Sequence, residues 1–358
     1  MHALAAVLGI LLILFILWDA FETMVLSRRV SQRFRITRYF YRLLWTPWRA
    51  AAMRVPPGKQ RENVLTIFGP LSLILLFAFW ALGLVVSFGL LHWGLGTQLA
   101  GPTGLTGLGE DLYMSGTTFF TLGLGDVTPR TALARALTVL ESGLGFGFLA
   151  LVIGYLPLIS QAFSRREVNI SMLDARAGSP PTAALLLRRH CGGGGDELRA
   201  LLREWERWSA ELLESHVSFA VLSYFRSQHD NQSWVAALTT ILDVCAFVMV
   251  RIDEGARPTA RSTFAMARHA VVDLCAVFRL KPTPPTADRL PPEEERRLES
   301  FLAAGGVTLP AADAASAKLT SLRAMYEPYV HALSTFLVMP LPAWVPAAEV
   351  RDEWHTIG

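Results

Sequence analysis

The sequence predicts an all-α membrane protein that carries a second, all-α domain in the cytosol. Of its 358 residues, 52% are hydrophobic and only 18% are charged, whereas roughly 25% of the residues of a typical globular domain are charged. The apolar residues are concentrated in residues 1–26, 64–95 and 132–162, and the second half of the chain has a mixed composition. These observations predict membrane-spanning helices followed by a soluble helical domain.

Three apolar segments are each long enough to cross a membrane, which takes about 20 residues. The first lies within residues 1–26. Because no Lys or Arg precedes it and residues 18–22 read Trp-Asp-Ala-Phe-Glu, we interpret it as a retained helix rather than a cleaved signal peptide. The second and third spans are predicted at residues 64–91 and 132–162.

Basic residues are unevenly divided between the two segments that connect these spans. Residues 27–62 carry ten Lys and Arg residues and one acidic residue, whereas residues 92–131 carry one basic residue, Arg130. Because basic loops stay in the cytosol, residues 27–62 and 164–358 are predicted to be cytosolic and the N-terminus to lie outside the cell membrane. Arginines interleaved with aromatic residues in 27–62 favour a helix on the anionic lipids of the inner leaflet over a nucleic-acid site.

The segment between the second and third spans has glycines at alternate positions. Residues 110–120 are predicted to form a short helix, and residues 121–126 read Thr-Leu-Gly-Leu-Gly-Asp. Gly123 and Gly125 permit backbone angles that other residues resist, so that successive carbonyl oxygens can face one axis. A cation that sheds its water needs such oxygens, and four copies of the loop around an axis would complete each ring of ligands.

Residues 118–129, Thr-Phe-Phe-Thr-Leu-Gly-Leu-Gly-Asp-Val-Thr-Pro, lie in a helix–pore loop–helix frame at 63–163. This arrangement resembles the potassium channel superfamily, namely bacterial one-pore-loop channels and the pore halves of two-pore-domain channels. The resemblance implies a homotetrameric, potassium-selective channel that conducts K⁺ passively, with residues 121–126 as its filter and no cofactor besides the transported ion. The implied K⁺ ligands are the backbone oxygens and the Thr121 hydroxyl in the run Thr121, Leu122, Gly123, Leu124 and Gly125.

The same resemblance implies that Asp126, at the outer mouth, braces the filter from behind, and Thr117 is taken as a further support. Leu124 stands where the family usually has a tyrosine whose phenol braces the filter. A weakly selective cation channel is therefore one alternative, and a non-conducting membrane receptor or scaffold is another. The sequence contains no HExxH, GxSxG or Walker motif, so we do not expect an enzyme.

Three residues of the third span carry alternative interpretations. Glu141 is an ionisable group at membrane depth, and it is expected either to form a hydrogen bond behind the filter or to face the cavity and attract cations. Gly145 is either a gating hinge or part of a helix-packing surface in which Gly143 and Gly147 form a GxxxG pair. Pro157 is expected to kink the inner end of the helix, where a gate would lie.

The cytosolic half is predicted to be almost entirely helical. Residues 233–250 are apolar enough to suggest a fourth span, but Asp243 in their middle favours a buried helix of a soluble bundle. No strand leads into a glycine fingerprint, so the sequence does not indicate a dinucleotide-binding domain. A ligand or regulator of this domain is expected, but the sequence does not identify it. Amphipathic stretches predict helices at 197–217, 233–252, 260–278, 293–303 and 314–336.

Overall fold

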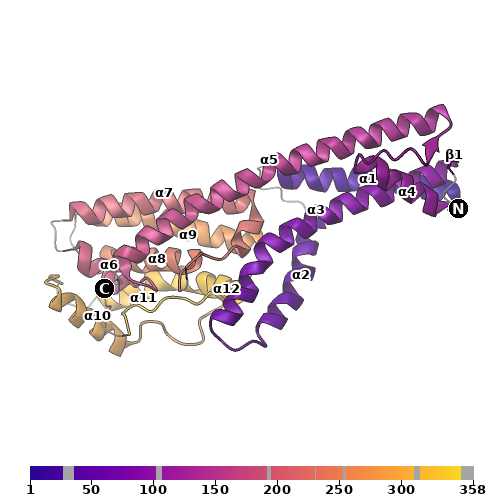
Figure 1. Ribbon diagram of the computed structural model, residues 1–358. Coiled ribbons are helices and arrows are strands. Elements are labelled where there is room, and N and C mark those ends of the chain that lie inside the picture. Colours follow the sequence, from indigo (N-terminus) through magenta and orange to yellow (C-terminus); the bar gives the residue numbers. More distant parts are fainter. Residues whose placement is uncertain are drawn as a thin grey trace, which may run out of the picture. The chain divides into compact units, whose positions relative to one another are not determined.

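Helices make up almost all of the regular structure in the computed structural model (Figure 1). The structure describes residues 1–26, 36–101, 107–191, 195–229, 231–252, 255–309 and 315–347. The chain divides into an N-terminal unit, Met1–Ser160, and a C-terminal unit, Gln161–Gly358. The boundary falls inside one long helix, α5 (Ala132–Ala177).

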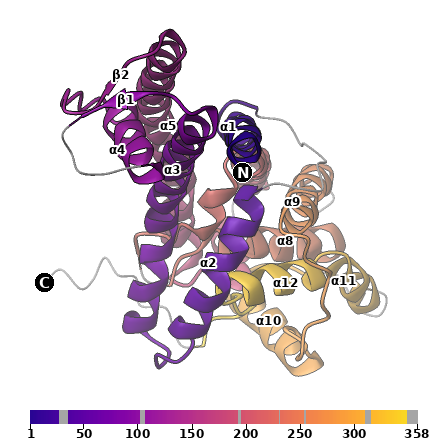
Figure 2. The same cartoon turned by 90° about the vertical axis from the view of Figure 1, so that its right-hand side faces the viewer.

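The N-terminal unit contains four further helices and one pair of very short strands. Strands β1 and β2 are antiparallel and join Leu99 to Pro129 and Ala100 to Thr128, and Figure 2 shows them alongside α4. No strand was expected from the sequence. The elements are α1 (His2–Met24), α2 (Ile36–Ala52), α3 (Lys59–Leu95), β1 (Leu99–Ala100), α4 (Leu108–Phe119) and β2 (Thr128–Pro129).

The helices of the predicted pore domain differ from their predicted bounds mainly at their polar ends. Helix α3 covers the predicted span at 64–91 with additional turns at both ends, and α4 begins two residues before the predicted 110–120 helix. Helix α5 continues well past the predicted end at residue 162. Hydropathy marks only the apolar part of a helix, whereas helix formation continues until a breaker, here the run Gly178-Ser-Pro-Pro181.

Helix α2 lies in the basic segment predicted at 27–62, whose residues 27–35 are outside the described part. Its aromatic face packs on α3: the Trp45 and Phe68 rings are 4.7 Å apart, and the Trp48 indole N–H donates to the Val64 carbonyl at 3.1 Å. Part of the amphipathic face is therefore covered by protein. Tyr39 and Leu43 remain exposed, and contact with lipid remains a prediction.

Asp19, near the C-terminal end of α1, is buried and links three helices. The Trp80 indole N–H of α3 donates to its carboxylate at 3.0 Å, and the Thr37 hydroxyl of α2 donates at 2.6 Å. A buried carboxylate needs hydrogen-bond donors, and here donors from two neighbouring helices take the place of solvent.

The C-terminal unit is a bundle of helices, with no strand among its described residues. The stretch predicted as one helix at 314–336 forms two helices, because Pro328 favours the first turn of a new helix. The helices are α6 (Ala183–His190), α7 (Asp196–Ser218), the 3-10 helix η1 (Ala220–Tyr224), α8 (Trp234–Arg251), α9 (Arg257–Val277), α10 (Pro292–Ala304), α11 (Ala315–Ala324) and α12 (Glu327–Leu337).

Helix α8 forms the centre of this bundle. Four described helices, α1, α3, α5 and α8, are long and apolar enough to cross a membrane. However, 89% of the 18-residue apolar stretch of α8 is buried inside the protein. Its Asp243 receives two hydrogen bonds from Arg289, at 2.6 and 3.2 Å, and one from the Tyr326 hydroxyl. A buried charge that is paired in this way is typical of a protein core, so α8 is a core helix of the bundle.

Candidate functional site

The backbone after α4 is the most unusual segment of the N-terminal unit. Helix α4 ends at Phe119, and the N–H groups of Thr121 and Leu122 turn back to the carbonyls of Thr118 and Thr117 at 3.0 and 2.8 Å. These bonds satisfy carbonyl groups that would otherwise be orphaned at a helix end. They hold the start of the 121–126 segment against the end of the short helix.

Positive φ angles recur at every second residue of this segment. Positive φ angles occur at Thr121 (57°), Gly123 (57°) and Gly125 (77°), and not at the two leucines between them. Such alternation turns successive N–H groups to one side of the chain and the carbonyls to the other. A positive φ is rare for a β-branched residue such as Thr121, and strain of this kind clusters at functional sites.

The side chains of Leu122 and Leu124 project away from the protomer. They are 61% and 63% exposed, respectively. Apolar side chains at this depth need lipid or protein around them. The apolar side chains of this segment are therefore uncovered in a single copy of the chain.

Asp126 connects the C-terminal end of this segment to α4. The Tyr113 hydroxyl donates to one carboxylate oxygen of Asp126 at 2.7 Å, and the Val127 N–H donates to the other at 3.1 Å. On the other side, a Cβ on Gly101 would lie only 2.4 Å from the Asp126 carbonyl oxygen. Together with the β1–β2 pair, these contacts hold the C-terminal end of the 121–126 segment.

Glu141 of α5 lies behind α4 and is completely buried. The hydroxyl of Ser115, on α4, forms a hydrogen bond with Oε1 of Glu141 and also lies 2.8 Å from the Val85 carbonyl oxygen of α3. Glu141 is therefore enclosed against α4 within a single copy of the chain, and its role in a pore stays a prediction. Tyr113 and Ser115 were not predicted as site residues. They are polar residues on the short helix that also carries the acidic residues Glu110 and Asp111, and this is the signal that could have identified them.

Gly145 lies where α5 crosses the end of α4. A Cβ on Gly145 would be 2.1 Å from the Phe119 carbonyl oxygen, whereas nothing lies within 4 Å of a Cβ on Gly143 or Gly147. Within one protomer the close approach is therefore made by Gly145, not by the GxxxG pair. Pro157 lies inside α5, and the Thr117 hydroxyl donates to the Met114 carbonyl at 3.0 Å.

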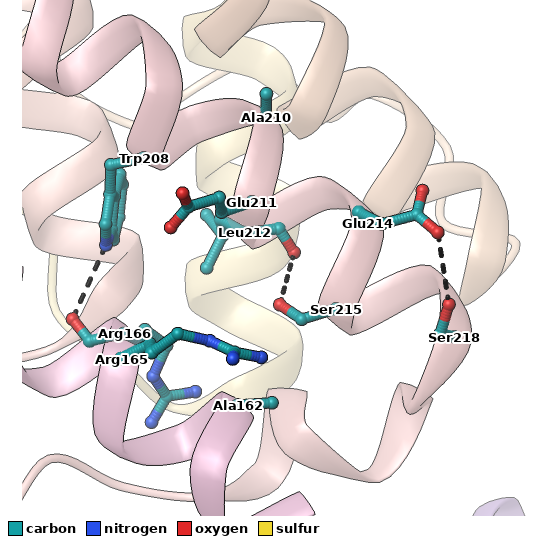
Figure 3. Close-up of a pocket in the computed structure, with 10 residues that line it drawn as sticks. All are labelled: Ala162, Arg165, Arg166, Trp208, Ala210, Glu211, Leu212, Glu214, Ser215 and Ser218. Carbon is teal, nitrogen blue, oxygen red and sulfur yellow. Dashed lines mark hydrogen bonds between the residues drawn. The ribbon is translucent and has the colours of Figure 1, made fainter. Parts of the chain in front are cut away.

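The C-terminal unit contains a cavity of about 510 Å³ between α5 and α7 (Figure 3). Arg166, in its wall, is buried and already donates to Glu167, His216 and the carbonyls of Leu222 and Phe225. Its guanidinium therefore serves the protein itself and leaves little for a ligand. The lining residues are Ala162, Arg165, Arg166, Trp208, Ala210, Glu211, Leu212, Glu214, Ser215 and Ser218.

His216, which contacts Arg166 in this unit, is neutral in the folded protein. Burial and the neighbouring Arg166 charge lower the pKa of His216 well below its usual value. Its Nδ1 lies 2.9 Å from the Leu212 carbonyl, and its Nε2 lies 3.2 Å from the Arg166 guanidinium. The tautomer with hydrogen on Nδ1 satisfies both contacts, because Nε2 is then free to accept.

We expect α7 to lose stability as the pH falls below about 6.5, the pKa of an unfolded histidine. The folded pKa is the lower one, so the unfolded chain binds more protons in this window and stability rises with pH up to about 6.5, at no more than about 1.4 kcal/mol per pH unit. Hydrogen exchange of α7 amides in the full chain over a pH series measures this. His216→Gln should remove most of the dependence, whereas the same change at the exposed His229 should leave it unchanged.

A comparison with protein families matches residues 72–157 to a family described as ion channel. The match extends from α3 through α4 and the 121–126 segment to Pro157 of α5. No curated protein and no solved structure matches the chain. The match supports ion channel activity rather than catalysis and, with the apolar helices α1, α3 and α5, a multi-pass membrane protein.

Proposed function

We propose that this chain, whose residues 72–157 match the ion channel family, is one subunit of a tetrameric, potassium-selective channel. The observation that carries the proposal is the alternation of backbone hand at Thr121, Gly123 and Gly125 directly after a short helix. Carbonyl oxygens aligned along one edge can replace the hydration shell of K⁺. One copy supplies only one oxygen per level, so a closed ring of ligands needs several copies around an axis.

In this proposal, K⁺ is bound by the carbonyl oxygens of Thr121, Leu122, Gly123 and Leu124 and by the Thr121 hydroxyl. Gly125 permits the turn that brings the chain to Asp126 at the outer mouth. The bond from Tyr113 to Asp126 braces the filter in the absence of a tyrosine at position 124. The roles of Thr117, Glu141 and Gly145 are to support the filter helix, and Pro157 marks the inner end of the pore.

The uneven burial of the apolar helices supports assembly. Only 11% of the 18-residue apolar stretch of α5 is buried in a single copy, compared with 56% of the corresponding stretch of α3. An inner helix with so little cover suits a position facing other subunits and a central pore, where small residues allow close packing. The exposed apolar residues on α5 include Leu133, Val139, Leu140, Phe146, Leu149, Leu151, Ile153, Leu156 and Leu158.

We further propose that the chain lies in the cell membrane with its N-terminus outside and the C-terminal unit in the cytosol. The basic side chains of residues 27–62 support this orientation. Helix α2 would then lie at the inner leaflet, with its exposed Tyr39 and Leu43 at the level of anionic lipids. Labelling of a cysteine introduced at Thr97, compared with one introduced at Arg54, from outside intact cells tests the orientation.

Purified full-length protein in liposomes with a K⁺ gradient tests the proposal. We expect K⁺ flux, a tetrameric mass after cross-linking, and a reversal potential in mixed K⁺ and Na⁺ that follows the K⁺ gradient. A reversal potential near zero would instead favour the weakly selective cation channel, which the leucine at position 124 suggests. A tetramer without flux would favour the receptor or scaffold, and a monomer would contradict both channel hypotheses.

Tyr113→Phe should reduce the preference for K⁺ over Na⁺ without preventing assembly. The variant removes only the hydroxyl that donates to Asp126 at 2.7 Å, and with it the hydrogen bond that joins the end of the 121–126 segment to α4. The expected readout is a shift of the reversal potential towards zero. Tyr39→Phe is the matched control, because that side chain is 52% exposed on α2, and it should leave the reversal potential unchanged.

A further inference from the structure

Glu141 is enclosed entirely within one copy of the chain. It has no exposed surface, so a neighbouring subunit cannot reach it without repacking of α3, α4 and α5. Its Oε2 has no hydrogen-bond partner among the described residues, and its Oε1 contacts Ser115 alone. No ion pair joins it to a cationic side chain in the described part of the chain. An ionised carboxylate in such surroundings is unfavourable, because a buried charge needs a counter-charge or several donors.

The hydrogens available at Ser115 lead to the same conclusion. A serine hydroxyl has one hydrogen to donate and two lone pairs that accept. The Ser115 oxygen contacts two acceptors, the Val85 carbonyl at 2.8 Å and Oε1 of Glu141. If Glu141 were ionised, a single hydrogen would have to serve both acceptors. If Glu141 carries a hydrogen, it donates to Ser115, Ser115 donates to Val85, and both bonds form.

We propose that Glu141 is a neutral carboxylic acid and that the chain of hydrogen bonds from Glu141 through Ser115 to Val85 positions α4 between α5 and α3. We name these three groups the rear relay. Its effect on permeation rests on the proposed channel function, whereas its protonation does not. Glu141 is a positioning residue here, because its hydrogen bond is with Ser115 and not with the 121–126 segment, and it acts through Ser115.

The placement of the rear relay on α4 explains how it would act on the filter. Residues two apart on a helix are about 200° apart around its axis, so Tyr113 and Ser115 lie on opposite faces. Tyr113 bonds to Asp126 on the filter side, while Ser115 bonds to the flanking helices. Four residues beyond Ser115, Phe119 contacts Gly145 of α5. The rear relay and this contact together fix the position of α4 between α3 and α5. The hydrogen bond from Tyr113 to Asp126 then fixes the position of the filter relative to α4.

The variants Glu141→Gln and Glu141→Leu test whether Glu141 acts as an uncharged hydrogen-bond donor or as a negative charge. The glutamine amide is uncharged and can donate to Ser115, so K⁺ flux and the K⁺/Na⁺ preference should match those of the unaltered protein. Leucine cannot donate, and Glu141→Leu, like Ser115→Ala, should lower the K⁺/Na⁺ preference about three- to tenfold, the range of one lost hydrogen bond. The double variant should be no worse than either single one, because both remove the same relay. Glu141→Gln as damaging as Glu141→Leu would overturn the proposal.

Infrared difference spectroscopy of the full chain in lipid supplies a readout that does not depend on conduction. The difference between the unaltered protein and Glu141→Gln should contain the carbonyl stretch of a neutral carboxylic acid. A carboxylate band in its place would overturn the proposal. If the unaltered protein fails to conduct, the channel function fails, but the infrared band and the thermal unfolding of the same variants still decide the state of Glu141.

Discussion

Replacement of Gly123 by alanine is expected to abolish K⁺ flux while the protein still inserts into the membrane. Gly123 has a φ angle of 57°, and the left-handed region costs a residue with a Cβ about 1–2 kcal/mol. In a tetramer the cost recurs in every subunit at the same level of the pore. The chain can relieve it by turning the peptide group, which points a carbonyl away from the ion path. Gly123→Asp adds a carboxylate to the same strain and should be equally inactive.

The measurement is K⁺-driven flux in liposomes at equal amounts of reconstituted protein. Gly109→Ala is the matched control, because Gly109 lies exposed in the first turn of α4 and nothing is within 4 Å of its added Cβ. This control should conduct and should bind K⁺ as the unaltered protein does. If the Gly123→Ala variant conducts with an unchanged reversal potential, residues 121–126 do not line the ion path.

Gly145→Ala is expected to destabilise the N-terminal unit and to reduce flux severely. The added Cβ would lie 2.1 Å from the carbonyl oxygen and 2.9 Å from the carbonyl carbon of Phe119. These are backbone atoms at the end of α4, so no side-chain rotation relieves the clash. Overpacking of this kind typically costs about 1–3 kcal/mol, and here the movement that relieves it also displaces the start of the filter segment.

Thermal unfolding of the tetramer, measured beside flux, distinguishes close packing from a gating hinge at Gly145. Close packing predicts a lower unfolding temperature for Gly145→Ala and little change for Gly109→Ala, whose Cβ would meet open space. A hinge predicts an altered open probability at unchanged stability. Unchanged unfolding of Gly145→Ala would therefore exclude the packing role and leave the hinge.

Part of the candidate site is readable from single residues. The spacing of Gly123 and Gly125 indicated an alternating backbone, because freedom at positive φ is a property of glycine itself. Thr121 carries no such signal: its φ of 57° is imposed by the hydrogen bonds at the end of α4. Tyr113 and Ser115 were missed for a related reason. Whether a tyrosine on a short helix reaches an aspartate thirteen residues later depends on how the chain returns.

The C-terminal unit shows the same division between local and long-range information. Asp243 in an apolar run indicated a buried helix rather than a fourth span, but its partner Arg289 lies 46 residues away in the chain. No periodicity identifies such a partner. The length of α5 was underestimated because apolar composition marks where a helix meets lipid, not where its backbone hydrogen bonds end.

The sequence alone determined the all-α class, the apolar spans, the alternating glycines and the intramembrane acid, because these depend on composition, spacing and the backbone freedom of individual residues. Only the tertiary structure decided that Glu141 faces Ser115, that Gly145 rather than the GxxxG pair makes the close approach, and that Tyr113 holds Asp126. Each of these depends on which helix lies against which. The arrangement of the helices depends on how side chains far apart in the chain pack together. A local sequence pattern does not reveal the free energy of that packing.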